Sequence, residues 1–121
     1  MPKQKVPDID FIWWVIAELS DLFANNEIFI NTDYQRGDIW SLTQKVELIE
    51  SINSRYSIGV MVLYTNDNNQ FEILDGQQRL ITLHQYMNGT LDLANSNITP
   101  YGNLGTQEKA LLNAYCVYYI G

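Results

Sequence analysis

The chain has 121 residues, of which 46% are hydrophobic and 12% aromatic, enough for one globular domain with its own core. No apolar run is long enough to span a membrane, residues 1–5 lack the apolar segment of a signal peptide, and the single cysteine, Cys116, excludes an internal disulfide. The formal charge of −7 argues against a large duplex-binding surface, and a reducing cytoplasm is the expected compartment.

The N-terminal third is expected to hold a tail, a helix, a strand and a loop. Residues 1–8 are expected to form a flexible tail, and residues 9–121 one domain. Apolar side chains then recur at spacings of three and four, which predicts an amphipathic helix over about 9–24. Residues 27–31 have the composition of a short strand, and residues 32–40 are expected to form an ordered loop.

The middle of the chain predicts a helix followed by a hairpin. Ser41 and Gln44 fit a capping box at the start of a helix that runs to about Arg55. The continuous apolar run 58–64 predicts a central strand buried on both faces. The run 70–74 is expected to pair with it as an antiparallel hairpin.

The C-terminal third predicts a helix from about Gln77 to Asn88, closed by Gly89. Residues 90–105 are expected to be an extended connection, followed by a short helix through 110–112 and a strand over 115–120. This last strand either pairs inside the sheet or belongs to a piece of a longer protein. The predicted fold class is α+β, a small mixed sheet flanked by helices.

The most informative stretch is Asp75-Gly76-Gln77-Gln78-Arg79, which lies between a predicted strand and a predicted helix. Gly76 would allow a ligand to approach the backbone, and the amides of Gln77 and Gln78 would face phosphate oxygens at the positive end of the helix. Arg79 could add a bidentate contact, and Asp75 could hold a magnesium-bound water or orient the arginine. The alternative is a simple Asp-Gly turn before a solvated helix face.

A second stretch, Tyr34-Gln35-Arg36, could form the opposite wall of the same anion site, with Arg36 as a second phosphate ligand. Tyr34 or Trp40 could stack on a base, or could pack against the core. His84 fits a packing role better than a catalytic one, and Cys116 is expected to be a buried, inert thiol. The chain lacks a GxxxxGK[ST] loop and is therefore not a P-loop NTPase.

Together these two stretches resemble the signature of the DGQQR family, a domain of the ParB/sulfiredoxin-like superfamily. The segment from Ile73 to Leu83 is similar to the family's DGQQR box, and the segment from Tyr34 to Trp40 resembles its first box. The family includes the N-terminal part of GmrSD-type type IV restriction enzymes and related phage-defence proteins. Its members continue further along the chain, so residues 9–121 are expected to be an incomplete N-terminal portion of a longer architecture.

The resemblance implies a domain that binds a nucleoside triphosphate with Mg²⁺ and, when complete, hydrolyses it to regulate a nuclease. The implied catalytic residues are Asp75, Gln77, Gln78 and Arg79, with Asp75 as the metal ligand. The implied nucleotide-binding residues are Tyr34, Gln35, Arg36, Gly76 and Arg79. The nuclease would lie outside this chain, which carries no nuclease signature, and DNA would be contacted only indirectly.

Two other functions stay open at this stage. The first is a non-enzymatic protein-interaction module that retains the fold, suggested by an exposed end strand and by the aromatic content; a homo-oligomer is a further expected assembly. The second is a ParB-like DNA-binding or nicking domain, which predicts salt-sensitive DNA binding and which the charge of −7 disfavours.

Overall fold

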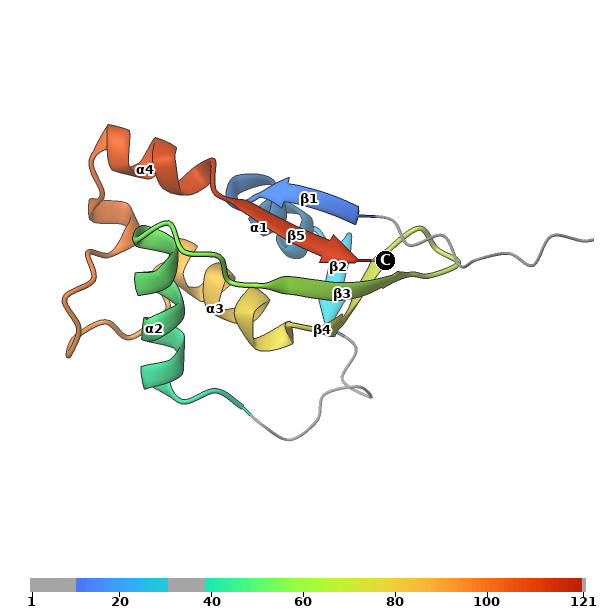
Figure 1. The fold of residues 1–121 in the computed structure, drawn as a ribbon, viewed down its shortest axis with the longest axis horizontal. Coiled ribbons are helices and arrows are strands. Elements are labelled where there is room, and N and C mark those ends of the chain that lie inside the picture. The colour runs from blue at the N-terminus through green and yellow to red at the C-terminus, as the bar shows by residue number, and fades with distance from the viewer. Residues whose placement is uncertain (1–10, 31–38, 121) are drawn as a thin grey trace, which may run out of the picture.

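A computed structural model describes residues 11–30 and 39–120 (Figure 1). Within them, five strands form one mixed sheet in the order β1-β5-β3-β4-β2. The strands are β1 (Phe11–Val15), β2 (Ile28–Ile30), β3 (Val60–Thr65), β4 (Phe71–Asp75) and β5 (Cys116–Ile120). The helices are α1 (Ile16–Ala24), α2 (Leu42–Asn53), α3 (Gln77–Met87) and α4 (Thr106–Asn113), with a 3₁₀ turn η2 at Tyr101–Asn103. This arrangement confirms the predicted α+β class.

Strand pairing brings several strand ends to one edge of the sheet. β3 and β4 form the predicted antiparallel hairpin, with a register irregularity between Val62 and Leu63 close to Asp75. β2 lies parallel to β4, and β5 lies parallel to β3. The carboxyl ends of β2 and β4 and the amino ends of β3 and β5 therefore meet at the same edge, which is where α3 begins.

The helix boundaries follow recognisable local signals. α2 begins with the predicted capping box, in which the Ser41 hydroxyl accepts from the Gln44 amide and the Gln44 side chain accepts from the Ser41 amide. α3 ends at Gly89, whose φ of 72° fits the left-handed C′ position. The amides of Gly89 and Thr90 donate to the carbonyls of Tyr86 and Gln85, which completes a Schellman motif.

The first helix was predicted too long. Residues 11–15 of the predicted 9–24 helix form β1, and α1 begins only at Ile16. The reason is a non-local one: β1 pairs antiparallel with β5 along its whole length, from Phe11 opposite Ile120 to Val15 opposite Cys116. Aromatic and β-branched residues favour such a strand once a partner is available. The expected tail, residues 1–8, lies outside the described residues.

Among the described elements, helices cover one face of the sheet only, which corrects the prediction that β3 is buried on both faces. Met61 and Leu63 are buried, whereas Val60 and Tyr64 on the opposite face are 41% and 52% exposed. α1 and α3 pack on the covered face, and α2 packs on α3 (Figure 1). On the open face, Tyr118 is the register partner of both Trp13 and Val60, so these three side chains form a row.

Two smaller predictions for the C-terminal region are settled by the sheet order. β5 lies between β1 and β3, which confirms pairing inside the sheet and removes the exposed end strand that suggested an interaction module. Cys116 is half-buried instead of buried.

The core itself lies between the covered face and the helices, and its fully buried members include Ile16, Leu19, Ile28, Ile49, Ile52, Met61, Ile73, Leu80, Tyr86, Val117 and Tyr119. No helix within the described residues is long and apolar enough to cross a bilayer.

Candidate anion site at the start of α3

The turn from β4 into α3 requires glycine. Asp75 is the last residue of β4, and Gly76 is the N-cap of α3 with a φ of +90°. A Cβ added at Gly76 would lie 2.2 Å from Met61 Cγ and 2.9 Å from Arg79 Nη2. Both the left-handed backbone and the close approach of Met61 therefore exclude a side chain. The chain reverses direction tightly here, and the first turn of α3 faces the sheet edge.

The partial positive charge at the amino end of α3 has no capping side chain among the described residues. Gly76 has no side chain to cap the helix, and the described residues supply no other side-chain cap and no acidic residue in the first turn. The Arg79 and Leu80 amides bond to the Gly76 carbonyl, so the amides of Gln77 and Gln78 stand at the very start of the helix. Uncapped amides at the positive end of a helix dipole favour an anion.

Arg79 lies directly against this turn and is held by the backbone. Its Nη1 donates to the Ile58 carbonyl at 2.6 Å, and its Nη2 lies 3.9 Å from Asp75 Oδ2. The Arg79 side chain is 17% exposed, whereas that of Asp75 is 71% exposed. A Cβ on Gly59 would lie 3.1 Å from the same Nη1, so the bare backbone of residues 58–59 lies against this nitrogen. The arginine is thus fixed in place while several of its five N–H donors remain available.

The two glutamines have different surroundings. Gln77 is buried, and its Nε2 donates to the Ile73 carbonyl at 3.1 Å, which ties the helix start to β4. Gln78 is half-buried, and its Oε1 accepts from the Trp40 amide at 3.2 Å. The Gln78 side chain therefore keeps its amide donors at the surface of the site, while that of Gln77 is committed to the core.

The second predicted wall, Tyr34, Gln35 and Arg36, lies outside the described residues. The residues that flank this stretch are nevertheless placed. Ile30 at the end of β2 pairs with Ile73, two residues before Asp75. Trp40 is bonded to Gln78 through its amide. Both described ends therefore lie beside the Asp75–Arg79 turn, because parallel strands bring their carboxyl ends to the same edge.

A residue that the sequence did not single out is Tyr119 on β5. It is fully buried, its ring packs edge-on against Trp14 at 5.0 Å, and its hydroxyl has no hydrogen-bond partner among the described residues. Burial raises the pKa of the Tyr119 phenol well above its ordinary value, and the charge of Arg79 offsets part of that rise. The spacing of a strand only indicates that Tyr119 points inward, and nothing in it reveals the missing partner.

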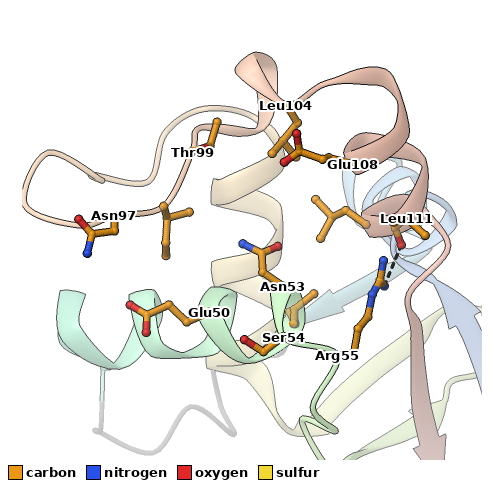
Figure 2. A pocket seen from close by; sticks show the side chains of 12 residues that line it. Glu50, Asn53, Ser54, Arg55, Asn97, Thr99, Leu104, Glu108 and Leu111 are labelled. Carbon is orange, nitrogen blue, oxygen red and sulfur yellow. Dashed lines mark hydrogen bonds between the residues drawn. The ribbon is translucent and has the colours of Figure 1, made fainter.

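The residues set aside as packing residues lie away from this turn. The His84 ring packs edge-on against Phe23 at 4.7 Å, and its Nδ1 lies 3.0 Å from the Asn88 side-chain nitrogen. Both contacts are remote from the helix start. A cavity of about 480 Å³ between α2, α4 and residues 97–99 is also separate, and none of Asp75 to Arg79 lines it (Figure 2). Figure 2 shows Arg55 at one end of this cavity, bonded to the Leu111 carbonyl at 2.9 Å.

A metal ion at this site would be coordinated mainly by the phosphate oxygens of a bound nucleotide and by few protein side chains. Within the described ranges, no group of three or more His, Cys, Asp and Glu side chains could hold an ion. The exposed carboxylate of Asp75 is a single oxygen donor at the edge of the turn. Magnesium is commonly bound through one or two carboxylates plus phosphate oxygens, so this donor set fits a phosphate-bound ion and not a dedicated metal cage.

Comparison with known proteins identifies the family. Residues 19–117 match the family model described as the GmrSD restriction endonuclease, N-terminal domain. No curated protein and no solved structure matches the chain. The matched region runs from α1 into β5 and includes the whole of the β4–α3 turn. Because the match spans most of the sequence, the chain belongs to the family of GmrSD restriction endonuclease N-terminal domains.

Proposed function

We propose that this domain binds a nucleoside triphosphate at the β4–α3 turn and, within a complete enzyme, hydrolyses it to regulate restriction. As a member of the GmrSD N-terminal family, the protein is a component of a restriction system. The observation that carries the proposal is the uncapped, positively polarised start of α3 at Gly76, with Arg79 fixed beside it. The exposed carboxylate of Asp75, 3.9 Å from Arg79, is the ion-pair partner of this arginine among the described residues, and the uncapped helix start leaves room for a further anion beside it.

Each residue of the turn has a proposed role. Arg79, joined by Arg36, binds phosphate oxygens, and Gly76 lets the phosphates approach the amides of Gln77 and Gln78. Gln78 positions the attacking water, because the Gln77 side chain is occupied by the Ile73 carbonyl. Tyr34 and Gln35 belong to the opposite wall. These roles stabilise charge and orient groups, which is how most phosphoryl-transfer sites act.

Asp75 is the residue that would hold Mg²⁺, which neutralises phosphate charge when bound. Its carboxylate also lies 3.9 Å from Arg79, so it orients the guanidinium in the absence of metal. A nuclease domain or subunit outside this chain would respond to the nucleotide, and DNA would be reached only through that partner.

A second candidate function is a protein-interaction module. The observation that favours it is now the open face of the sheet, where Trp13 is 59% and Tyr118 49% exposed. The two functions differ in what stabilises the isolated domain. An interaction module needs no nucleotide, whereas a nucleotide-binding domain unfolds at a higher temperature in its presence.

The test is titration of Mg²⁺ with ATP, GTP, CTP or UTP into the purified domain, followed by calorimetry and thermal unfolding. We expect one or more of them to bind and raise Tm, and Arg79→Ala to lower that affinity at least tenfold, as loss of a charge-assisted contact predicts. Lys109→Ala is the control. Lys109 lies on α4, over the Tyr101 ring, and carries the same charge as Arg79 far from the turn. Unchanged triphosphate affinity in Arg79→Ala would rule out the proposed site.

A further inference from the structure

A second cavity adjoins the proposed phosphate site. It has a volume of about 370 Å³, within the usual range of small-molecule sites, and lies between residues 55–59 and residues 114–118. These two segments precede β3 and open β5, so the cavity lies at the same edge of the sheet as the β4–α3 turn. Arg55, Tyr56, Ser57, Ile58, Gly59, Tyr115, Cys116 and Tyr118 are among its lining residues.

Only a thin piece of backbone separates this cavity from Arg79. Ile58, which lines the cavity, accepts a hydrogen bond from Arg79 Nη1 at 2.6 Å. Gly59 also lines it, and its missing Cβ would lie 3.1 Å from the same nitrogen. The guanidinium therefore lies directly behind the cavity wall, so a ligand with its phosphates at Arg79 has to pass around residues 58–59 to place another group in the cavity.

The wall of the cavity is aromatic and is not explained by core packing. Tyr56 is 68% and Tyr118 49% exposed, although both are large side chains. The Tyr115 hydroxyl donates to the Tyr56 carbonyl and fixes the main chain at Tyr56. The exposed Tyr56 ring is therefore attached to a held backbone. Ser57 Oγ accepts from the Gly59 amide at 3.2 Å and holds the loop between them. Exposed tyrosines on fixed backbone are suited to stacking on a planar ring.

We infer that this cavity is the base-binding subsite of the nucleotide site, with Tyr56 and Tyr118 stacking on the nucleobase. The inference rests on the proposed function and adds which part of the nucleotide lies where. Arg55 also lines the cavity, but it lies at the carboxyl ends of α2 and α4, whereas Arg79 lies at the amino end of α3, so the phosphates go to Arg79 and the base to the tyrosines. Stacking accepts any base, whereas the Ser57 hydroxyl offers a polar contact that can select among them.

The experiment compares a nucleotide with its phosphate part alone. Each nucleoside triphosphate and inorganic tripolyphosphate are titrated with Mg²⁺ into the full 121-residue chain. We expect the best nucleoside triphosphate to bind about tenfold more tightly than tripolyphosphate, the size of one stacked base. Tyr118→Ala and Tyr56→Ala should each reduce that advantage severalfold and leave tripolyphosphate affinity unchanged, whereas Tyr118→Phe should keep it.

Tyr64→Ala is the matched control. Tyr64 is 52% exposed on the same open face of β3, but it lies at the far end of the strand and outside the cavity. Tyr56 and Tyr118 are exposed enough for alanine to be tolerated, and circular dichroism of each variant checks the fold. Equal affinities for nucleotide and tripolyphosphate, or full nucleotide affinity in both tyrosine variants, would overturn the subsite and leave the phosphate site standing. Failure of the wild type to bind either molecule would overturn the proposed function and the subsite together.

Discussion

Arg55 and Arg79 make the same kind of bond in opposite electrostatic settings. Each donates through Nη1 to a main-chain carbonyl, at 2.9 Å to Leu111 and at 2.6 Å to Ile58. Arg55 directly follows α2 and reaches the last turn of α4, so it lies at the negative ends of two helices. Arg79 lies in the first turn of α3, at a positive end. The fold accounts for Arg55, whereas the proposed function gives Arg79 a second role beyond its contacts with Ile58 and Asp75, namely binding an anion.

The largest expected effect comes from adding a side chain at Gly76. Gly76→Ala would combine a left-handed backbone with a clash against Met61 and Arg79, and we expect it to lower the free energy of unfolding by about 3 kcal/mol. Gly89→Ala is the control, because Gly89 has a φ of +72° but no atom within 4 Å of an added Cβ. Its cost should be about 1 kcal/mol. Equal losses in urea unfolding would mean that the Met61 contact does not constrain the turn.

The next effect separates the two arginines directly. At ten times its Kd, tripolyphosphate should stabilise the wild type and Arg55→Ala by about 1.4 kcal/mol, and Arg79→Ala by much less. Arg55→Ala should itself cost about 1 kcal/mol with or without the anion, since it loses a carbonyl bond at a helix end. Thermal unfolding with and without tripolyphosphate measures both terms. Equal stabilisation of the two alanine variants would remove the distinction between the arginines.

A smaller effect concerns the unpartnered hydroxyl near Arg79. Tyr119→Phe should raise the free energy of unfolding by about 1 kcal/mol, because the buried hydroxyl has no hydrogen-bond partner among the described residues and such a group is costly. Tyr86→Phe should do the reverse, because the Tyr86 hydroxyl donates to the Thr99 carbonyl at 2.7 Å. The two rings are equally buried, so only the hydrogen bond differs. Destabilisation by Tyr119→Phe would indicate that its hydroxyl has a partner in solution.

The smallest effect is absent at neutral pH and appears only in alkali. Burial raises the pKa of Tyr86, Tyr115 and Tyr119 above the ordinary value of 10.0. A raised folded-state pKa means that the stabilising contribution is complete below pH 10 and is lost as the pH rises through the folded values. Urea unfolding should therefore give constant stability up to about pH 10 and a decline above it, with a shallower decline in Tyr119→Phe. A pH-independent curve to pH 11.5 would contradict the burial of these phenols.

Local signals predicted most of the fold. The Ser41–Gln44 capping box, the hairpin and the Gly89 helix end each depend on a few neighbouring residues, and each is present. The helix predicted over residues 11–15 was wrong because their partner, β5, lies about a hundred residues away and no local pattern indicates the pairing. The prediction that the strand over 58–64 is buried on both faces was wrong for the same kind of reason, since a continuous apolar run does not say how many faces other elements cover.

The candidate site was predicted in its residue types but not in its contacts. The Asp75–Arg79 order indicated a strand, a tight turn and a helix, and the structure has all three. It could not indicate that Gln77 is bonded to Ile73, or that Arg79 is held by Ile58, because both contacts depend on how α3 packs against the sheet. The Tyr34–Arg36 wall stays a prediction.

The position of β5 has a consequence for synthesis on the ribosome. Within residues 11–30 and 39–120, β5 is the one strand that pairs with β1, and β5 also lies between β1 and β3. Until residues 116–120 leave the ribosomal tunnel, β1 has no strand to join and the covered face of the sheet stays incomplete. Long-range pairing of this kind slows folding and exposes apolar surface while it is awaited. A chaperone is therefore expected to contact the nascent N-terminal segment until β5 emerges, which crosslinking of stalled nascent chains of increasing length can follow.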